Sequence, residues 1–178
     1  YCLLWQLTGG TMSYNYSHED FKTMVRTIKN TKTETLLVKL AEDEDANVRL
    51  AVAYNPNTPS DVLGKLANDE EWLIRYAVAT NQNTPSDVLE KLSNDEKSLI
   101  RYAVAINPNT PSYILIKLSN DENKYVRCGV ATNLKTPLFI LIKLSWDENF
   151  IVRYNVKRNE NTPCEIRVRI SNHRFDTC

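Results

Sequence analysis

The sequence repeats itself every 26 residues over most of its length. A Thr-Pro pair recurs at that spacing without gap or insertion, and columns of Leu, Arg and Asn keep the same step. The pairs are Thr58-Pro59, Thr84-Pro85, Thr110-Pro111, Thr136-Pro137 and Thr162-Pro163. A period of roughly 20 to 50 residues is the signature of a solenoid, in which a unit buries its apolar face only by stacking on its neighbours. The period therefore predicts a short solenoid.

Each unit has the pattern of two short helices. Thr58 and Pro59 suit the cap and the first turn of a first helix. The apolar residues after them fall on one arc at helical spacing, and Asp69 is placed to cap a second helix. The Pro-containing run 81–85 ends that second helix. No strand pattern occurs anywhere, so the predicted fold class is all-α.

The ends of the array differ from its middle, as capping segments of a solenoid do. We assign residues 1–16 to an N-terminal tail, of which 1–11 are given no functional weight, and 17–31 to an N-terminal capping helix. Residues 32–161 form five repeats, and 162–178 a C-terminal partial repeat or cap. Arg167 stands there at a position where earlier units have a core Leu.

The charge of the chain is balanced. It has 178 residues, with 22 Lys and Arg against 22 Asp and Glu and a pI of about 6.9. Proteins that bind nucleic acid generally carry a basic excess, because affinity comes largely from neutralising phosphates. The balance makes such a function less expected, although charges of one sign can still gather on one face.

The four cysteines, Cys2, Cys128, Cys164 and Cys178, have no metal-ligand spacing, and two of them lie at the ends of the sequence. Neither a disulfide framework nor a zinc site is indicated. We therefore expect a reducing, cytoplasmic setting. The apolar run 1–7 is far too short to cross a bilayer, so no membrane partner is expected.

The repeat resembles the leucine-rich repeat variant family. The residues that carry the resemblance are Val48-Arg49, Val52-Ala53, Asn55-Pro56, Thr58-Pro59, Leu63 and Leu66, and the likeness covers residues 32 to about 170. It implies a right-handed superhelix with HEAT-like stacking, in which one helix of each pair is α and the other α or 3₁₀. A member of the family adds an iron–sulfur region rich in cysteine before its repeats. This chain has only Cys2 there, so the resemblance implies no cluster.

Two basic columns run along the array. Arg49, Arg75, Arg101, Arg127 and Arg153 recur in step with a column of Asp-Glu pairs that begins at Asp43. We expect a structural ladder of charge-assisted hydrogen bonds between units, the alternative being a row of Arg that faces a ligand. The second column is Lys39, Lys65, Lys91, Lys117, Lys143 and Arg169. It forms either an ordinary solvated face or a stripe that follows a phosphate backbone.

The outward arc of the first helix changes character along the array. Two outward positions, roughly 60° apart on the helix, are polar or Gly in the units that begin at 58 and 84. In the next two units they read Tyr113/Ile116 and Phe139/Ile142, and Trp146 and Phe150 lie in irregular columns nearby. This pattern predicts an exposed apolar patch that binds a protein partner or a second copy. Alternatively, the terminal segment 162–178 folds back and covers it.

The sequence has no catalytic constellation. Its histidines, His18 and His173, lie at opposite ends of the array, and no Gly-rich phosphate loop or paired-carboxylate motif occurs. We predict a non-enzymatic scaffold, without cofactor or metal, that mediates protein–protein interaction or self-association. The alternative is nucleic-acid binding through the Lys and Arg columns.

Overall fold

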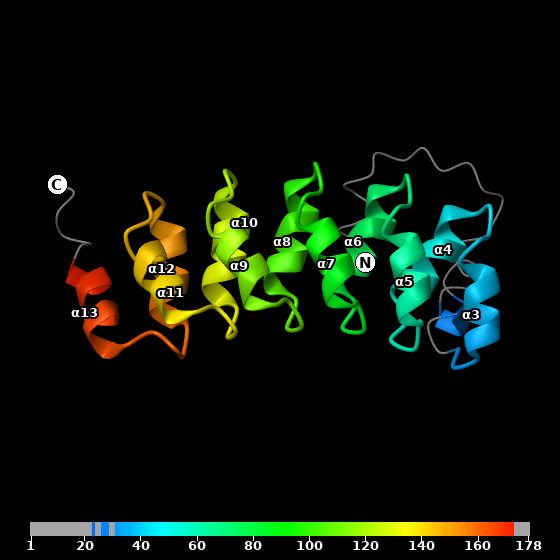
Figure 1. Cartoon of the computed structure of the whole chain (residues 1–178), viewed down its shortest axis with the longest axis horizontal. Coiled ribbons are helices and arrows are strands. Elements are labelled where there is room, and N and C mark those ends of the chain that lie inside the picture. The colour runs from blue at the N-terminus through cyan, green and yellow to red at the C-terminus, as the bar shows by residue number, and fades with distance from the viewer. Residues whose placement is uncertain (1–22, 24–25, 29–30, 173–178) are drawn as a thin grey trace.

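The computed structural model describes residue 23, residues 26–28 and residues 31–172, and in this part of the chain every regular element is a helix (Figure 1). The first helix of each pair is called the A helix and the second the B helix. The A helices are α3 (Glu34–Leu40), α5 (Ser60–Leu66), α7 (Ser86–Leu92), α9 (Ser112–Leu118) and α11 (Leu138–Leu144). The B helices are α4 (Ala46–Ala53), α6 (Trp72–Thr80), α8 (Ser98–Ile106), α10 (Lys124–Thr132) and α12 (Phe150–Arg158), and α13 (Cys164–Asn172) follows them. The predicted all-α solenoid is confirmed.

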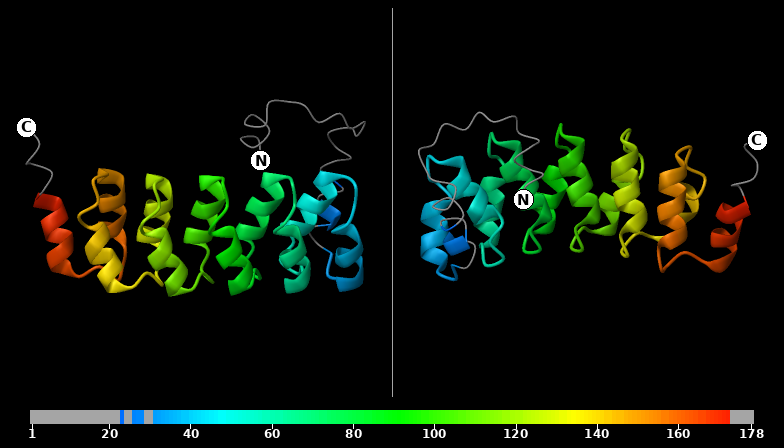
Figure 2. Two further views of the ribbon diagram at one scale, coloured as in Figure 1. Left: turned by 45° about the horizontal axis from the view of Figure 1, so that its top comes forward. Right: turned by 180° about the vertical axis from the view of Figure 1, so that it is seen from behind.

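The helix pairs stand side by side in one row (Figure 2). Successive B helices pack directly against one another, whereas an A helix packs mainly against B helices. Both members of each described pair are α-helical, so the α/α form of the repeat is the one observed. The predicted capping helix 17–31 lies mostly outside the described residues, and the tail 1–16 lies wholly outside them.

One continuous core runs along the row. The A helices contribute aliphatic side chains such as Leu63, Leu89 and Leu115, which are fully buried. The B helices contribute small residues such as Ala77 and Ala103, which let neighbouring helices approach closely. Because the core lies between neighbouring units, a single unit cannot form a complete core by itself.

Two predicted helix caps are wrong. Thr58 is buried, and its hydroxyl donates to the carbonyl of Val52 at 2.6 Å, so it serves the end of α4 rather than the start of α5. The last carbonyls of a helix lack partners within that helix, which explains the attraction. Asp69 accepts the Glu71 N–H at 3.0 Å, but α6 begins only at Trp72, with Glu71 in the cap position.

A buried asparagine at the end of each B helix connects successive units. The Asn107 amide donates to the carbonyls of Ala79 at 2.8 Å and Asn81 at 3.0 Å, both in the preceding unit. Its Oδ1 accepts the N–H of Asn109 at 2.8 Å. Asn81, Asn133 and Asn159 make the same two contacts to the preceding unit. Asn55 donates instead to the carbonyls of Ile28 and Thr31. We call these residues the asparagine ladder: Asn55, Asn81, Asn107, Asn133 and Asn159. Each amide therefore donates to carbonyl groups that belong to the preceding part of the chain and not to its own unit.

The asparagine ladder ends at Arg167. Its guanidinium donates through Nη2 to the carbonyls of Asn159 at 2.9 Å and Glu160 at 3.0 Å, and through Nε to that of Thr162 at 2.7 Å. In earlier units the carbonyl equivalent to that of Asn159 is bound by the next asparagine of the ladder. Arg167 thus replaces a core Leu because this position supplies the donors at the end of the ladder.

Gly129 lies where two B helices, α8 and α10, approach closely. A Cβ added there would lie 2.9 Å from the Cβ of Ala105 and 3.2 Å from Cγ2 of Ile106, closer than carbon atoms pack. Gly64, also inside a helix, has only Cγ2 of Val88 nearby, at an ordinary 3.7 Å. The two glycines therefore have different roles.

We expect Asn107→Ala to lower the free energy of unfolding by about 2 to 4 kcal/mol, because it leaves the buried Ala79 carbonyl and the Asn109 N–H without partners. It also removes one of the two donors to the Asn81 carbonyl, which keeps the Thr84 N–H. Urea denaturation followed by circular dichroism measures the loss. Asn109→Ala is the control, since Asn109 is exposed and should cost about 0.5 kcal/mol or less. Equal losses in the two variants would contradict the role given to the ladder.

We expect Gly129→Ala to destabilise the protein by about 1 to 3 kcal/mol, because the added methyl group overpacks the contact between α8 and α10. Gly64→Ala is the matched control and should stabilise by about 0.5 to 1 kcal/mol, since alanine favours the helix and meets no close neighbour. Thermal melting of both variants tests the pair. A stabilised Gly129→Ala protein would show that the close approach is not required.

Candidate functional site

Four arginines of the Arg column form ion pairs with the following unit. Each of these ion pairs is called an Arg rung. In one of them, Arg101 Nε lies 2.6 Å from Oδ2 of Asp121 and Nη2 lies 2.9 Å from Oδ1, a two-point contact. Its Nη1 donates to the carbonyls of Asp95 and Glu96. The other rungs are Arg49–Asp69, Arg75–Asp95 and Arg127–Asp147. These four guanidinium groups are thus engaged between units, as a structural ladder requires.

The fifth member of the Arg column differs. Arg153 makes the equivalent contacts to the carbonyls of Asp147 at 2.7 Å and Glu148 at 2.9 Å. It pairs with no carboxylate of the described residues. In the other ion pairs the Asp lies 20 residues after the Arg, and the corresponding position here is His173, which lies outside the described residues. Arg153 therefore provides the backbone half of a rung without the ion pair.

The rung at Asp121 is held in the charged state. Burial alone would raise the pKa of this carboxyl group, but the hydrogen bonds from Arg101 and from the Asn123 N–H outweigh that effect and lower the pKa. The charges of Arg101 and Arg127 act in the same direction. The hydrogen bond to Asp121 in turn raises the pKa of Arg101. Both partners therefore stay ionised near neutral pH.

The Lys column lies along the A helices, and its side chains point back to the preceding unit. Lys65 Nζ lies 3.2 Å from a carboxylate oxygen of Glu42. Lys91 donates to the Asn68 side chain, and Lys117 donates to the Ser93 hydroxyl at 2.9 Å. Lys143 and Arg169 make corresponding contacts to Ser119 and Ser145, and Lys39 is exposed. The structure thus brings the column into one row, with most of its cations hydrogen-bonded.

The four apolar residues predicted to form a patch are all exposed. The accessible fraction is 50% for Tyr113, 36% for Ile116, 59% for Phe139 and 41% for Ile142. They lie on the outward sides of α9 and α11, and the Tyr113 hydroxyl donates to Glu90 at 2.9 Å. We call these four residues the apolar patch.

Other apolar side chains in the same units are also exposed. Leu138 is 47% exposed, Trp146 60% and Phe150 66%. The described part of the terminal segment does not cover the patch, because α13 packs against α12 as the A helix of one more unit would. In the described part of that segment, residues 162–172, the alternative that it folds back over the patch is therefore wrong.

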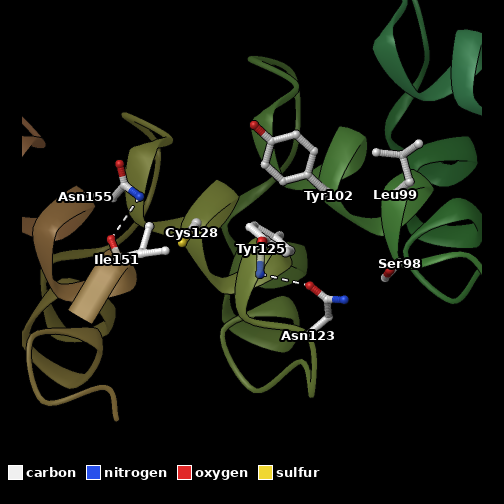
Figure 3. A pocket seen from close by; sticks show the side chains of 8 residues that line it. All are labelled: Ser98, Leu99, Tyr102, Asn123, Tyr125, Cys128, Ile151 and Asn155. Atoms are coloured by element: carbon white, nitrogen blue, oxygen red, sulfur yellow. Dashed lines mark hydrogen bonds between the residues drawn. The ribbon is translucent and has the colours of Figure 1, made fainter. Parts of the chain in front are cut away.

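A shallow hollow on the B-helix side was not predicted. It has a volume of about 380 Å³ and lies between α8, α10 and α12 (Figure 3). Its lining is Ser98, Leu99, Tyr102, Asn123, Tyr125, Cys128, Ile151 and Asn155. Within the lining, Asn123 Oδ1 accepts the Tyr125 N–H, and the Asn155 amide donates to the Ile151 carbonyl.

The hollow follows from one departure in the repeat. A single column reads Tyr76, Tyr102, Cys128 and Tyr154, so the third of these units lacks the phenol ring of the others. Cys128 is 6% exposed, and burial raises the pKa of its thiol. The small neutral side chain leaves space rather than a reactive group. The replacement of Tyr by Cys is visible in the sequence, but the side of the solenoid to which this column points is not.

Other kinds of site are lacking in the part of the chain that the structure describes. No cluster of His, Cys, Asp and Glu there has the arrangement of a metal site. Among the described helices, none has the length and apolar character needed to cross a bilayer.

We expect Arg101→Ala to lower the free energy of unfolding by about 2 to 4 kcal/mol at neutral pH, because it leaves a buried carboxylate unpaired. Because folding lowers the pKa of Asp121, the rung stabilises above the unfolded pKa of about 3.9 and this stabilisation is lost as the pH falls through the folded value. The variant should therefore lose less stability than the parent protein between neutral and acidic pH. Urea denaturation across that range measures both effects.

Arg153→Ala is the control for the rung, since it removes the backbone contacts without an ion pair. It should cost less and leave the acid dependence of the parent protein. Loss of ligand binding in Arg101→Ala at unchanged stability would instead show that the Arg column faces a ligand.

Comparison with known proteins agrees with this geometry. The model of the family described as leucine rich repeat variant matches residues 46–71. The structure is similar to a solved leucine-rich repeat variant with a novel repetitive structural motif, with a TM-score of 0.62 and 25% identity. The match covers 88% of this chain and 66% of that protein, so this chain spans slightly less than two thirds of its length.

No curated protein matches the sequence. The single unit matched by the family model begins with α4 and ends just before α6, and therefore contains one B helix followed by one A helix. The resemblance to the leucine-rich repeat variant family that the repeat columns indicate is thereby confirmed, both in a repeat and in the fold.

Proposed function

We propose that this protein is a non-enzymatic helical-repeat scaffold that binds a protein partner, or a second copy of itself, through the apolar patch. The exposure of Tyr113, Ile116, Phe139 and Ile142 on adjacent A helices carries this proposal. Large apolar side chains gathered on one exposed face usually mark an interaction surface. Aromatic residues in particular are enriched where proteins meet.

The fold does not require apolar residues at these positions. The equivalent positions in earlier units carry Asp61, Gly64, Asp87 and Glu90, and the helices α5 and α7 are the same length as α9 and α11. The core is built from other columns, such as the buried Leu63 and Leu115. The helix lengths and the core therefore do not explain the apolar residues of the patch, whereas a role in binding explains them.

The remaining features fit a scaffold rather than an enzyme. Repeating acidic residues such as Asp69 and Asp95 are engaged in the Arg rungs. Cys128 is buried, and its raised pKa disfavours the thiolate. Both described cysteines, Cys128 and Cys164, are free, which suits the reducing, cytoplasmic setting included in this proposal.

The Lys column gives less support to nucleic-acid binding. A phosphate would have to compete with the contacts that the structure gives these ammonium groups, such as Lys65 with Glu42 and Lys117 with Ser93. The Arg column is engaged between units in the same way. Protein binding is therefore the main proposal, and nucleic-acid binding is the alternative.

Changing Tyr113, Ile116, Phe139 and Ile142 together to Ser should abolish partner capture or self-association while preserving the fold. Exposed substitutions of this kind change stability by about 0.5 kcal/mol or less each. Analytical ultracentrifugation measures self-association, and affinity capture from the native source, quantified against the parent protein, measures partner binding.

The matched control changes four exposed apolar residues of the B helices, Leu99, Ile106, Tyr125 and Tyr154, to Ser. It removes a similar apolar area without altering the patch. If the patch variant keeps the oligomeric state and the captured partners of the parent protein, the proposed surface is wrong. If only the control loses them, binding belongs to the B-helix side.

A further inference from the structure

We infer that the apolar patch receives an acidic amphipathic protein segment, in which apolar side chains are flanked by Asp or Glu. The inference rests on the proposed function and specifies the partner's chemistry. It follows from a row of cations that runs beside the apolar side chains, from the neutral partners that hold those cations, and from the charge of this half of the array.

An apolar row and a cationic row lie next to each other on the A-helix side. Ile116, Ile142 and Val168 occupy one column, with accessible fractions of 36%, 41% and 52%. The next residue in each unit is basic, namely Lys117, Lys143 and Arg169. Because adjacent residues on a helix are separated by roughly 100°, the two columns form neighbouring rows across three units. A ligand on the apolar row therefore has cations along one side.

The cations of this half are held in place without being neutralised. Lys117 Nζ donates to the hydroxyl of Ser93 at 2.9 Å, and Lys143 Nζ to that of Ser119 at 3.2 Å. Lys65, at the acidic end of the column, instead forms an ion pair with Glu42 at 3.2 Å. A hydroxyl orients an ammonium group but leaves its charge, so Lys117 and Lys143 remain able to attract a carboxylate.

Arg169 extends the cationic row to α13. Its guanidinium lies 4.0 Å from the centre of the Trp146 ring, and Nη2 donates to the Ser145 hydroxyl. Among the residues described, Nε of Arg169 is a buried donor without a hydrogen-bond partner. The stack positions a planar cation beside an exposed aromatic ring. This corner thus offers a charge and an apolar surface together.

Charge is segregated along the array. Residues 32–109 contain eight Lys and Arg against thirteen Asp and Glu, whereas residues 110–172 contain ten against six. The patch lies in the second half, where the excess is positive. Charges of one sign gathered around a site attract partners of opposite charge and repel others. The field therefore favours an acidic segment and disfavours a basic one.

The apolar row favours a protein segment over nucleic acid. A phosphate backbone would engage Lys117 and Lys143 but would leave Ile116, Ile142 and Val168 without apolar contacts. An amphipathic segment satisfies both rows, since its apolar side chains cover one and its carboxylates meet the other. We therefore assign a protein partner, with nucleic acid as an outcome of the test.

The test uses two fluorescent amphipathic helical peptides that share the same Leu and Phe face and carry either Glu or Lys on the polar face. Fluorescence anisotropy with the full chain measures the affinity of each. The Glu peptide should bind about tenfold more tightly than the Lys peptide, and its affinity should fall with added salt because exposed charges are screened.

Three variants separate the contributions. Changing Lys117, Lys143 and Arg169 together to Gln should weaken the Glu peptide about tenfold. The matched control changes Lys39, Lys65 and Lys91 to Gln, removing the same charge from the same column, and should change the affinity less than about twofold if the effect is local. The Ser variant of the apolar patch should lose the peptide. Circular dichroism verifies that each variant is folded.

The outcomes distinguish this inference from the proposed function. Equal binding of both peptides, lost only in the patch variant, overturns the acidic partner and leaves the patch as the binding surface. Binding of the Glu peptide that survives in the patch variant overturns the assignment of both rows. Failure of both peptides to bind overturns the acidic partner, while the proposed function still depends on its own capture experiment. A poly-dT oligonucleotide that displaces the Glu peptide and needs the same cations assigns the row to nucleic acid.

Discussion

At the end of each B helix, carbonyl groups accept hydrogen bonds from an asparagine of the next unit, and one of them, such as that of Ala79 in α6, has no other donor among the described residues. A buried carbonyl without a partner costs free energy, so the asparagine of the next unit stabilises the helix end to which it donates. Asn107 does this for Ala79 and Asn81, and Asn133 does it in turn for Ala105 and Asn107. The register set by these bonds places the Arg rungs, the small Ala column and the buried Leu column between units.

The columns that connect the units are distinct from the positions that face solvent. Asparagine, arginine and the core residues point between units, and a change in any of them alters two units at once. The outward positions of the A helices make few such contacts, which is why Asp61 and Phe139 occupy equivalent places in one fold. The architecture therefore separates stability from recognition along a single helix.

The repeat, the helix pairs and the core columns could be predicted because a period of 26 residues and helical apolar spacing are local properties. The caps could not, because Thr58 satisfies a carbonyl of the preceding helix rather than an N–H of its own. The asparagine column was visible, but its partners lie 26 and 28 residues away and depend on how units stack. The hollow at Cys128 was missed for the same reason, since a column must be oriented before a missing ring leaves space.

The asparagine ladder also determines how such an array can change length. From Asn81 onward, each asparagine of the ladder bonds to equivalent residues of the preceding unit, so duplication of an internal 26-residue block, such as 84–109, would create the same bonds at the new junction. The junction at α13 is different, because Arg167 donates to the Asn159 carbonyl, which corresponds to the carbonyl that Asn107 binds at Asn81. A gene encoding this chain can therefore gain a unit in the interior of the array by one duplication event that keeps every bond of the ladder.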